Sequence, residues 1–395
     1  MSRDLLQRSR SGAVGRRPAL RQLVALAAGA ALAQPTRAGP AAHPPATARA
    51  LRQRLAAAWR LPDGSGGELD RVGVLEIDWL AARITVQADH PAPGRAHGLC
   101  AMPDGGFVAL ASRPGRWLLR CDAQGRLLQR HELADDHRPQ TLGGHALLSA
   151  DGRHLFTCET HPDSGQGWIG VRSPDSLRLV GEFPSHGLDP HQMVLDDAGR
   201  LWVANGGIPR GPNGRKTDLA RMAPSLVQLS PADGRLLAEH RLDDPRLSLR
   251  HLAWAGRDRA RLGIALQAEH DDERQRHAAP LLAVLEDGRL VLPARDAQDL
   301  GYAGDIAAGP AGGFVVSGQK SGRGLWWHPG EAGRLTPVAE LGEPCALASW
   351  DQGRGVLLAA RRGAARWHVS DPPRMLPWPR AMAPDNHWLL LDPRA

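Results

Sequence analysis

The sequence contains few cysteines and none of the short motifs that mark common catalytic sites. Its four cysteines include no C-x-x-C pair, which excludes zinc ribbons and thioredoxin-type redox centres. It also lacks G-x-S-x-G, Walker and H-E-x-x-H motifs, and no G-x-G-x-x-G precedes a predicted helix. The acidic pairs Asp135-Asp136 and Asp196-Asp197 do not support a glycosidase, because neighbours on a strand point to opposite faces. Motifs alone leave enzyme activity uncertain.

Disordered, collagen-like and coiled-coil proteins are excluded by composition and pattern. Hydrophobic residues make up 42% and charged residues 23% of the 395 residues, values typical of a globular protein. There is no Gly-X-Y period and no sustained heptad, while 45 glycines and 32 prolines predict many short elements. A chain of this size buries enough core without disulfides, so buried free thiols are favoured over the three possible pairings of the cysteines.

Positive charge is concentrated at the N-terminus. The formal net charge is +7, but residues 1–33 contribute +5, which leaves +2 for the remainder. The other arginines are scattered among acidic residues, and no basic run is interleaved with aromatic residues. Nucleic acid is therefore not an expected partner.

Residues 1–33 have the pattern of an export signal. Arg16-Arg17 precedes an uncharged apolar run from Leu23 to Ala33, and Ala31-Leu32-Ala33 offers a small-residue cleavage site. Adjacent arginines before a weakly hydrophobic run suggest twin-arginine translocation, with the Sec route and a non-cleaved amphipathic tail as alternatives. Residues 34–50 are expected to be a linker. No other run reaches about 18 apolar residues, so the mature chain should have no integral membrane segment and be periplasmic.

An internal repeat organises the rest of the chain. Six units begin at positions that are 48, 46, 60, 54 and 40 residues apart, namely His97, His145, His191, His251, Asp305 and Cys345. Each position opens a short apolar strand that is followed by a second strand, and third and fourth strands complete each unit. Four strands per unit of about 40–50 residues, joined by Gly- and Asp-containing turns, predict the blades of a WD40-like β-propeller.

The two ends of the chain supply one further blade. Residues 386–391 predict a further first strand, in which His387 lies 42 residues after Cys345, whereas residues 55–59, 72–76 and 84–86 predict three strands that lack a first. Joining them closes the ring and removes an exposed sheet edge. We therefore predict an all-β fold, a seven-bladed β-propeller of four-stranded antiparallel blades, as a single domain over residues 51–395. A pair of β-sandwiches does not explain so regular a period.

The residues that open the first strands should meet around the propeller axis. First strands line the central channel, and chain direction places all their starting points on one face. These residues are His97, His145, His191, His251, Asp305, Cys345 and His387. Every one of them can ligate a metal ion. Because copper, zinc and iron usually take about four to six ligands, we expect a subset to hold one ion, or several to hold a cluster or an anionic ligand.

Two residues outside this set are also candidate ligands. His186 precedes His191 by five residues, and Glu159 lies in a polar loop expected over the same face. The candidate metal site is therefore His97, His145, His186, His191, His251 and His387, with Asp305, Cys345 and Glu159 as further members, and copper, iron or zinc as the ion. In the alternative interpretation, each repeated histidine only hydrogen-bonds the neighbouring blade.

Many short stretches, in order along the chain, are similar to one bacterial family. They include Arg95-Ala96-His97-Gly98-Leu99, Arg113-Pro114-Gly115-Arg116, Ser185-His186-Gly187, Pro190-His191, Ala204-Asn205-Gly206-Gly207-Ile208, Ser248-Leu249-Arg250-His251-Leu252 and Asp385-Asn386-His387. Through them, most of residues 51–395 resembles the family called domain of unknown function 1513. The resemblance implies an exported propeller, often encoded beside imelysin-like and di-haem oxidoreductase-like proteins in iron-uptake clusters. It implies no particular reaction.

Three functions follow from these expectations. The first is a periplasmic binding or scaffold protein for iron or metal acquisition, with a transition metal or a metal-bearing, imelysin-like partner at the histidine face. The second is a metal-dependent periplasmic enzyme, either a copper-type oxidoreductase resembling the histidine-ringed propeller of nitrous oxide reductase or a lactonase-like hydrolase. The third is an interaction module without an ion.

Overall fold

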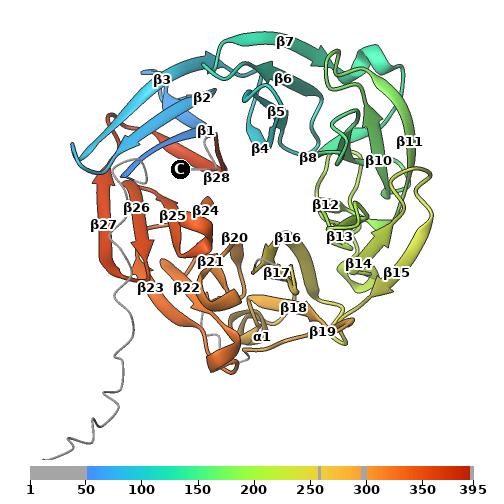
Figure 1. Ribbon diagram of the computed structural model, residues 1–395. Coiled ribbons are helices and arrows are strands. Elements are labelled where there is room, and N and C mark those ends of the chain that lie inside the picture. Colours follow the sequence, from blue (N-terminus) through green and yellow to red (C-terminus); the bar gives the residue numbers. More distant parts are fainter. Residues whose placement is uncertain (1–50, 257–258, 295–299, 392–395) are drawn as a thin grey trace, which may run out of the picture. The chain divides into compact units, whose positions relative to one another are not determined.

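Seven four-stranded antiparallel sheets form a ring in the computed structural model, which describes residues 51–256, 259–294 and 300–391 (Figure 1). The sheets are the blades of a β-propeller, so the predicted fold class is confirmed. The predicted export signal and linker, residues 1–33 and 34–50, lie outside the described residues. In the described part of the chain, no helix combines the length and the apolar character needed to cross a membrane.

Six of the blades are each made of four consecutive strands. Blade 2 contains β4 (Ala96–Ala101), β5 (Phe107–Ala111), β6 (Trp117–Cys121) and β7 (Leu127–Glu132). Blade 3 contains β8 (Thr141–Leu148), β9 (Leu155–Thr160), β10 (Gln166–Arg172) and β11 (Leu179–Leu188). Blade 4 contains β12 (Pro190–Leu195), β13 (Leu201–Asn205), β14 (Ser225–Leu229) and β15 (Leu236–His240).

The remaining three of these blades follow the same order. Blade 5 contains β16 (Leu247–Ala255), β17 (Arg261–Ala268), β18 (Leu282–Glu286) and β19 (Arg289–Val291). Blade 6 contains β20 (Ala303–Ala308), β21 (Phe314–Gly318), β22 (Arg323–Trp327) and β23 (Thr336–Glu340). Blade 7 contains β24 (Leu347–Trp350), β25 (Gly355–Ala360), β26 (Gly363–His368) and β27 (Asp371–Pro377). One short helix, α1 (Glu273–Ala278), lies in the β17–β18 loop, and 3-10 turns occupy Leu133–Asp136, Leu219–Arg221, Pro310–Gly312, Pro329–Glu331 and Asp351–Gly353.

Blade 1 joins the two ends of the chain, as predicted. Its innermost strand is β28 (Ala383–Leu390), and it continues outward through β1 (Arg52–Pro62), β2 (Glu68–Asp78) and β3 (Arg83–Pro91). Leu55 of β1 lies opposite Leu390 of β28, and Ala57 opposite Trp388. In Figure 1 the red strand β28 therefore lies beside the blue strand β1. Hydrogen bonds between these strands close the ring.

The hydrophobic core lies between neighbouring blades. The described residues form seven buried apolar clusters, and each cluster joins two adjacent blades. Strand β5 illustrates the reason, because Phe107 and Ala109 pack toward blade 1 whereas Val108 and Leu110 pack toward blade 3. A strand covered on both faces needs apolar residues at every position. This requirement explains the continuous apolar runs of the repeat.

All four cysteines are buried free thiols, as the sequence favoured. Each lies in one of the clusters between blades. Burial raises the pKa of the Cys100 and Cys345 thiols to about 12, so they stay protonated at neutral pH. They behave as small apolar residues rather than as nucleophiles.

We expect the strand shared by both termini to hold the ring closed, and Trp388 tests this. The Trp388 indole is 7% exposed and packs edge-on against Trp378 of the next blade, with ring centroids 6.0 Å apart. Trp388→Ala should lower the free energy of unfolding by about 3–5 kcal/mol through lost burial and a cavity. Urea denaturation measures it, with the exposed Leu80→Ala as control. Equal stability of the two variants would contradict this role.

Candidate metal centre

The innermost strands carry β-bulges at the residues predicted to face the axis. The pairing register of β4 against β5 shifts between Ala96 and Leu99, on either side of His97. Corresponding shifts enclose His145 in β8, His191 in β12, His251 in β16, Asp305 in β20 and His387 in β28. A bulge leaves its extra residue outside the ladder and redirects the side chain. Six blades therefore present one polar side chain each near the axis.

Five of these side chains meet as a buried group, here called the histidine ring: His97, His145, His191, His251 and His387. Their ring centroids lie between 4.5 and 6.4 Å apart in the contacting pairs. Each of the five residues is at most 7% exposed. Gly144 permits this approach, because at its φ of +104° a Cβ atom would lie 2.8 Å from Cδ2 of His97.

The nitrogen atoms of the histidine ring are close enough to share one ion. One nitrogen from each of His97, His145, His191 and His251 lies within 4.8 Å of the others. Nε2 of His191 is 2.8 Å from Nε2 of His251, and Nε2 of His145 is 3.1 Å from Nε2 of His387. Four nitrogens bound at about 2.0–2.1 Å to a tetrahedral ion would be separated by roughly 3.3 Å. The separations of 2.8 and 3.1 Å lie near this value, so the spacing of the nitrogens is compatible with one bound ion.

The other predicted ligands lie elsewhere or are engaged. Asp305 is 3.4 Å from Nδ1 of His387, but its oxygens already accept the backbone N–H groups of Ile306 and Leu347. The Cys345 thiol donates to the carbonyl of Ala359 at 3.6 Å. Asp305 is thus placed to orient a histidine, and Cys345 belongs to the core.

His186 and Glu159 make their contacts outside the histidine ring. His186 is exposed on β11, with Nε2 2.9 Å from the carbonyl oxygen of Gly234. Glu159 is fully buried in β9, where it accepts a hydrogen bond from Thr157 and forms an ion pair of 2.7 Å with Arg172. The structure does not bring either residue to the five imidazoles.

Neighbouring charged groups determine which ring nitrogens hold protons. Asp385 lies 2.9 Å from Nδ1 of His97, so this nitrogen carries the proton and Nε2 keeps its lone pair. Asp305, which lies 3.4 Å from Nδ1 of His387, likewise favours the tautomer of His387 with its proton on Nδ1. The reverse holds for His191, whose Nδ1 faces the guanidinium of Arg113 and must accept, so that its proton sits on Nε2. The lone pairs available to an ion are therefore those of the other four imidazoles. Two buried nitrogens, Nδ1 of His145 and Nδ1 of His251, have no hydrogen-bond partner.

Burial keeps four histidines of the ring neutral: His97, His145, His191 and His251. It lowers the pKa of His97 to about 4, even though the hydrogen bond with Asp385 opposes the shift. Burial and the neighbouring His387 hold the pKa of His145 and of His251 well below the ordinary value. For His191, burial and Arg113 do the same. At pH 7 these imidazoles are therefore uncharged, which is the form that binds transition metals.

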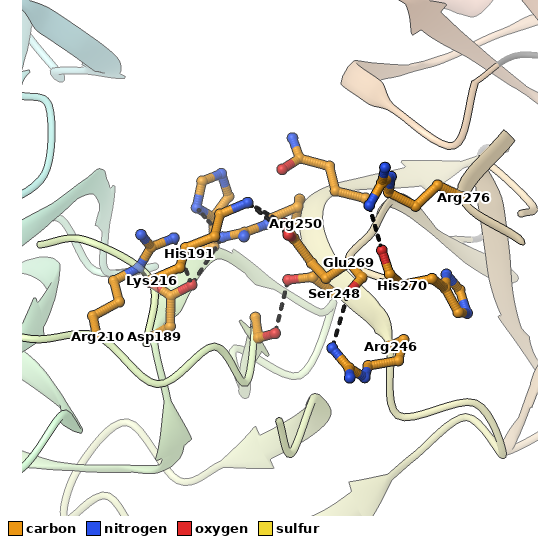
Figure 2. Close-up of polar contacts among 12 residues, drawn as sticks. Asp189, His191, Arg210, Lys216, Arg246, Ser248, Arg250, Glu269, His270 and Arg276 are labelled. Carbon is orange, nitrogen blue, oxygen red and sulfur yellow. Dashed lines mark hydrogen bonds and ion pairs between the residues drawn. The ribbon is translucent and has the colours of Figure 1, made fainter. Parts of the chain in front are cut away.

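A cluster of charged residues adjoins the histidine ring, and the sequence-based prediction did not include it. Figure 2 shows Asp189, Arg210 and Arg250 beside His191, with Lys216 and Glu269 nearby. Lys216 is 2.5 Å from a carboxylate oxygen of Glu269. Asp189 and Asp385 each stand two positions before a ring histidine, His191 and His387. This repeated spacing was the available signal.

Together, the fold and this site define a seven-bladed propeller whose axis holds a buried ring of histidines. Residues 90–391 match the family described as protein of unknown function (DUF1513). The chain belongs to this family, and the resemblance found in the sequence is confirmed. No curated protein matches the sequence.

Several solved structures share the fold at low sequence identity. Hydrazine synthase of Kuenenia stuttgartiensis is 12% identical with a TM-score of 0.56, over 79% of this chain and 92% of that chain. A candidate 6-phosphogluconolactonase of Bacteroides fragilis is 14% identical with a TM-score of 0.56, over 88% and 99%. Virginiamycin B lyase of Staphylococcus aureus is 11% identical with a TM-score of 0.51, over 72% and 85%. These similarities establish the propeller fold alone.

The buried neutral histidines predict a stability that falls in mild acid. An unfolded histidine titrates near pH 6.5, whereas folded His97 titrates near 4, so between these values the unfolded chain binds more protons. In metal-free protein, the free energy of unfolding should be constant above about pH 6.5 and decrease toward pH 4. Urea denaturation at several pH values in EDTA measures the slope.

A matched pair of variants assigns this pH dependence to the ring. His251→Gln removes one titrating group and should reduce the slope by up to about 1.4 kcal/mol per pH unit. His186→Gln, at an exposed position, should leave the slope unchanged. The same slope in both variants would show that the acid sensitivity arises elsewhere.

Proposed function

We propose that this protein is an exported β-propeller that binds one transition-metal ion, copper, iron or zinc, in its histidine ring. Its role is that of a periplasmic binding or scaffold protein in metal acquisition. The observation that carries the proposal is the convergence of neutral, buried imidazole nitrogens from separate blades within 4.8 Å. Imidazole is a ligand suited to each of these metals.

The surroundings of the ring support metal binding over a purely structural role. Histidine ligands in metal sites usually donate their second ring N–H to a carboxylate or carbonyl, and Asp385 and Asp305 occupy this position for His97 and His387. Histidines that only connected neighbouring blades would be expected to have hydrogen-bond partners for both ring nitrogens. The buried, unpartnered Nδ1 atoms of His145 and His251 do not fit that expectation.

The composition of the ring favours binding or electron transfer over hydrolysis. Catalytic zinc sites typically have three protein ligands and an open position for water or substrate. Even without His191, four buried histidines supply enough ligands to fill the shell of one ion. A metal-dependent lactonase-like hydrolase is therefore the less favoured alternative. A copper-type oxidoreductase remains the second candidate, because an all-nitrogen set suits copper.

Elemental analysis of protein exported in its native host, and never passed over a nickel column, tests the proposal. The expected result is close to one equivalent of copper, iron or zinc per chain. The double variant His145→Ala/His251→Ala should retain less than about a tenth of this metal, because two ligands are lost. Circular dichroism and thermal unfolding check that the variant is folded. Copper with a visible charge-transfer band would favour the oxidoreductase.

Two further variants separate metal binding from general damage. Asp385→Asn leaves all five imidazoles in place and should weaken metal affinity about 10–100-fold through loss of the carboxylate partner of His97. His186→Ala, at an exposed position off the ring, should keep full metal content. Metal-free protein after attempted reconstitution would overturn the proposed site and leave the histidines as contacts between blades.

Export and partner binding have their own test. If residues 1–33 are a cleaved signal, the periplasmic protein should begin at Gln34, and N-terminal sequencing of that fraction measures this. Arg16→Lys/Arg17→Lys should block export by the twin-arginine route and leave export by the Sec route intact. An uncut chain retained in the cytoplasm would contradict export. Capture of imelysin-like proteins from the same fraction would support the role in metal acquisition.

A further inference from the structure

Three arginines converge on one buried carboxylate beside the histidine ring. Asp189 accepts from Nε of Arg210 at 2.8 Å and from Nη1 of Arg250 at 3.0 Å, and Nη1 of Arg113 also donates to it. Nη2 of Arg210 makes a fourth contact at 3.3 Å. Arg113, Arg210, Arg250 and Asp189 are here called the Asp189 cluster. Figure 2 shows three of its members, Asp189, Arg210 and Arg250.

The Asp189 cluster carries more positive charge than its carboxylate can neutralise. Three guanidinium groups share one carboxylate, which leaves a net charge of +2, and the four contacts occupy the acceptor sites of Asp189. The nearby Lys216 is already paired with Glu269. The arginine side chains are 18%, 14% and 2% exposed for Arg113, Arg210 and Arg250. Charge buried to this extent without a counter-ion is costly.

A depression in the surface gives a ligand access to this charge. It is small, with a volume of about 20 Å³, so a ligand would lie at its mouth, and Arg113, Arg210, Asp189, Thr141 and Thr160 are among its lining residues. Thr141 and Thr160 are paired on neighbouring strands, β8 and β9. Their hydroxyls make no hydrogen bond to other residues in the described ranges, so both remain available as donors. Two arginines and two threonines, together with Asp189, thus line the depression.

Contacts within its own loop hold the guanidinium of Arg210 in one position. Arg210 also donates through Nη1 to the carbonyl of Gly214 at 2.9 Å, which fixes its guanidinium plane. Gly214 has a φ of +74° and lies against Pro114, where a Cβ atom would be 2.8 Å from the proline ring. The guanidinium is therefore held in place before any ligand arrives, which reduces the entropic cost of binding.

We propose that this depression is a binding site for a small oxyanion, a carboxylate or phosphate group, held by Arg113, Arg210, Thr141 and Thr160. Arginine recognises both anions through paired, charge-assisted hydrogen bonds. Nη2 of Arg113 also contacts Nδ1 of His191, so the anion would bind one guanidinium away from the histidine ring. The site is distinct from the proposed metal centre and does not depend on it.

Isothermal titration calorimetry of the full chain with inorganic phosphate, malonate and citrate, at constant ionic strength, tests the site. We expect saturable binding of at least one oxyanion, with chloride bound at least about tenfold more weakly. Arg210→Gln should weaken binding about tenfold or more, and Thr160→Val about threefold, because each removes donors from the depression. Tighter binding of phosphate than of the carboxylates, or the reverse, identifies the anion class.

Matched controls distinguish this site from general surface charge and from the metal centre. Arg52→Gln removes an exposed, ion-paired arginine in blade 1 and should leave oxyanion affinity unchanged. The metal-site variant His145→Ala/His251→Ala should retain oxyanion binding. Equal affinities in wild type, Arg210→Gln and Thr160→Val would overturn the proposal, as would equal affinity for chloride and oxyanions or an absence of binding. Thr160→Val retains all the arginines, so its oxyanion affinity tests the proposal even if Arg210→Gln does not fold.

Discussion

The site depends on the β-bulges of the innermost strands. In a regular strand the residues alternate between two faces, and in this propeller both faces of a blade are packed against its neighbours. A side chain can be aimed at the axis only where the ladder is interrupted. Six innermost strands contain such an interruption, and in each the residues left out of the pairing include a histidine or an aspartate. Because the bulge recurs in six blades, polar side chains from six blades lie near the axis.

The cost of that centre is offset by the rest of the molecule. Burying five imidazoles and the Asp189 cluster is unfavourable, because polar groups lose water and two ring nitrogens find no partner. Seven apolar clusters between blades, and the pairing of β1 with β28, supply the opposing stability. Carboxylates and guanidinium groups around the ring then fix where protons sit. Burial would raise the pKa of Asp385, yet His97 and Arg95 hold it well below its usual range.

The histidine ring and the Asp189 cluster form one continuous polar region with two kinds of binding capacity. The ring offers neutral nitrogen lone pairs, which suit a metal cation. The Asp189 cluster offers excess positive charge at a solvent-open depression, which suits an oxyanion. Arg113 contacts both, since its guanidinium reaches Asp189 and His191.

The sequence by itself determined the architecture and the set of histidines that line the axis. Strand periodicity and a repeat of regular length are local properties, so seven blades, their closure by both termini and the convergence of His97, His145, His191, His251 and His387 followed from spacing. Tertiary structure alone decided the rest. Cys345 and Asp305 hold equivalent positions in the repeat, but neighbouring backbone groups occupy them. The Asp189 cluster joins residues up to 137 positions apart, Arg113 to Arg250, and such long-range contacts leave no local pattern in the sequence.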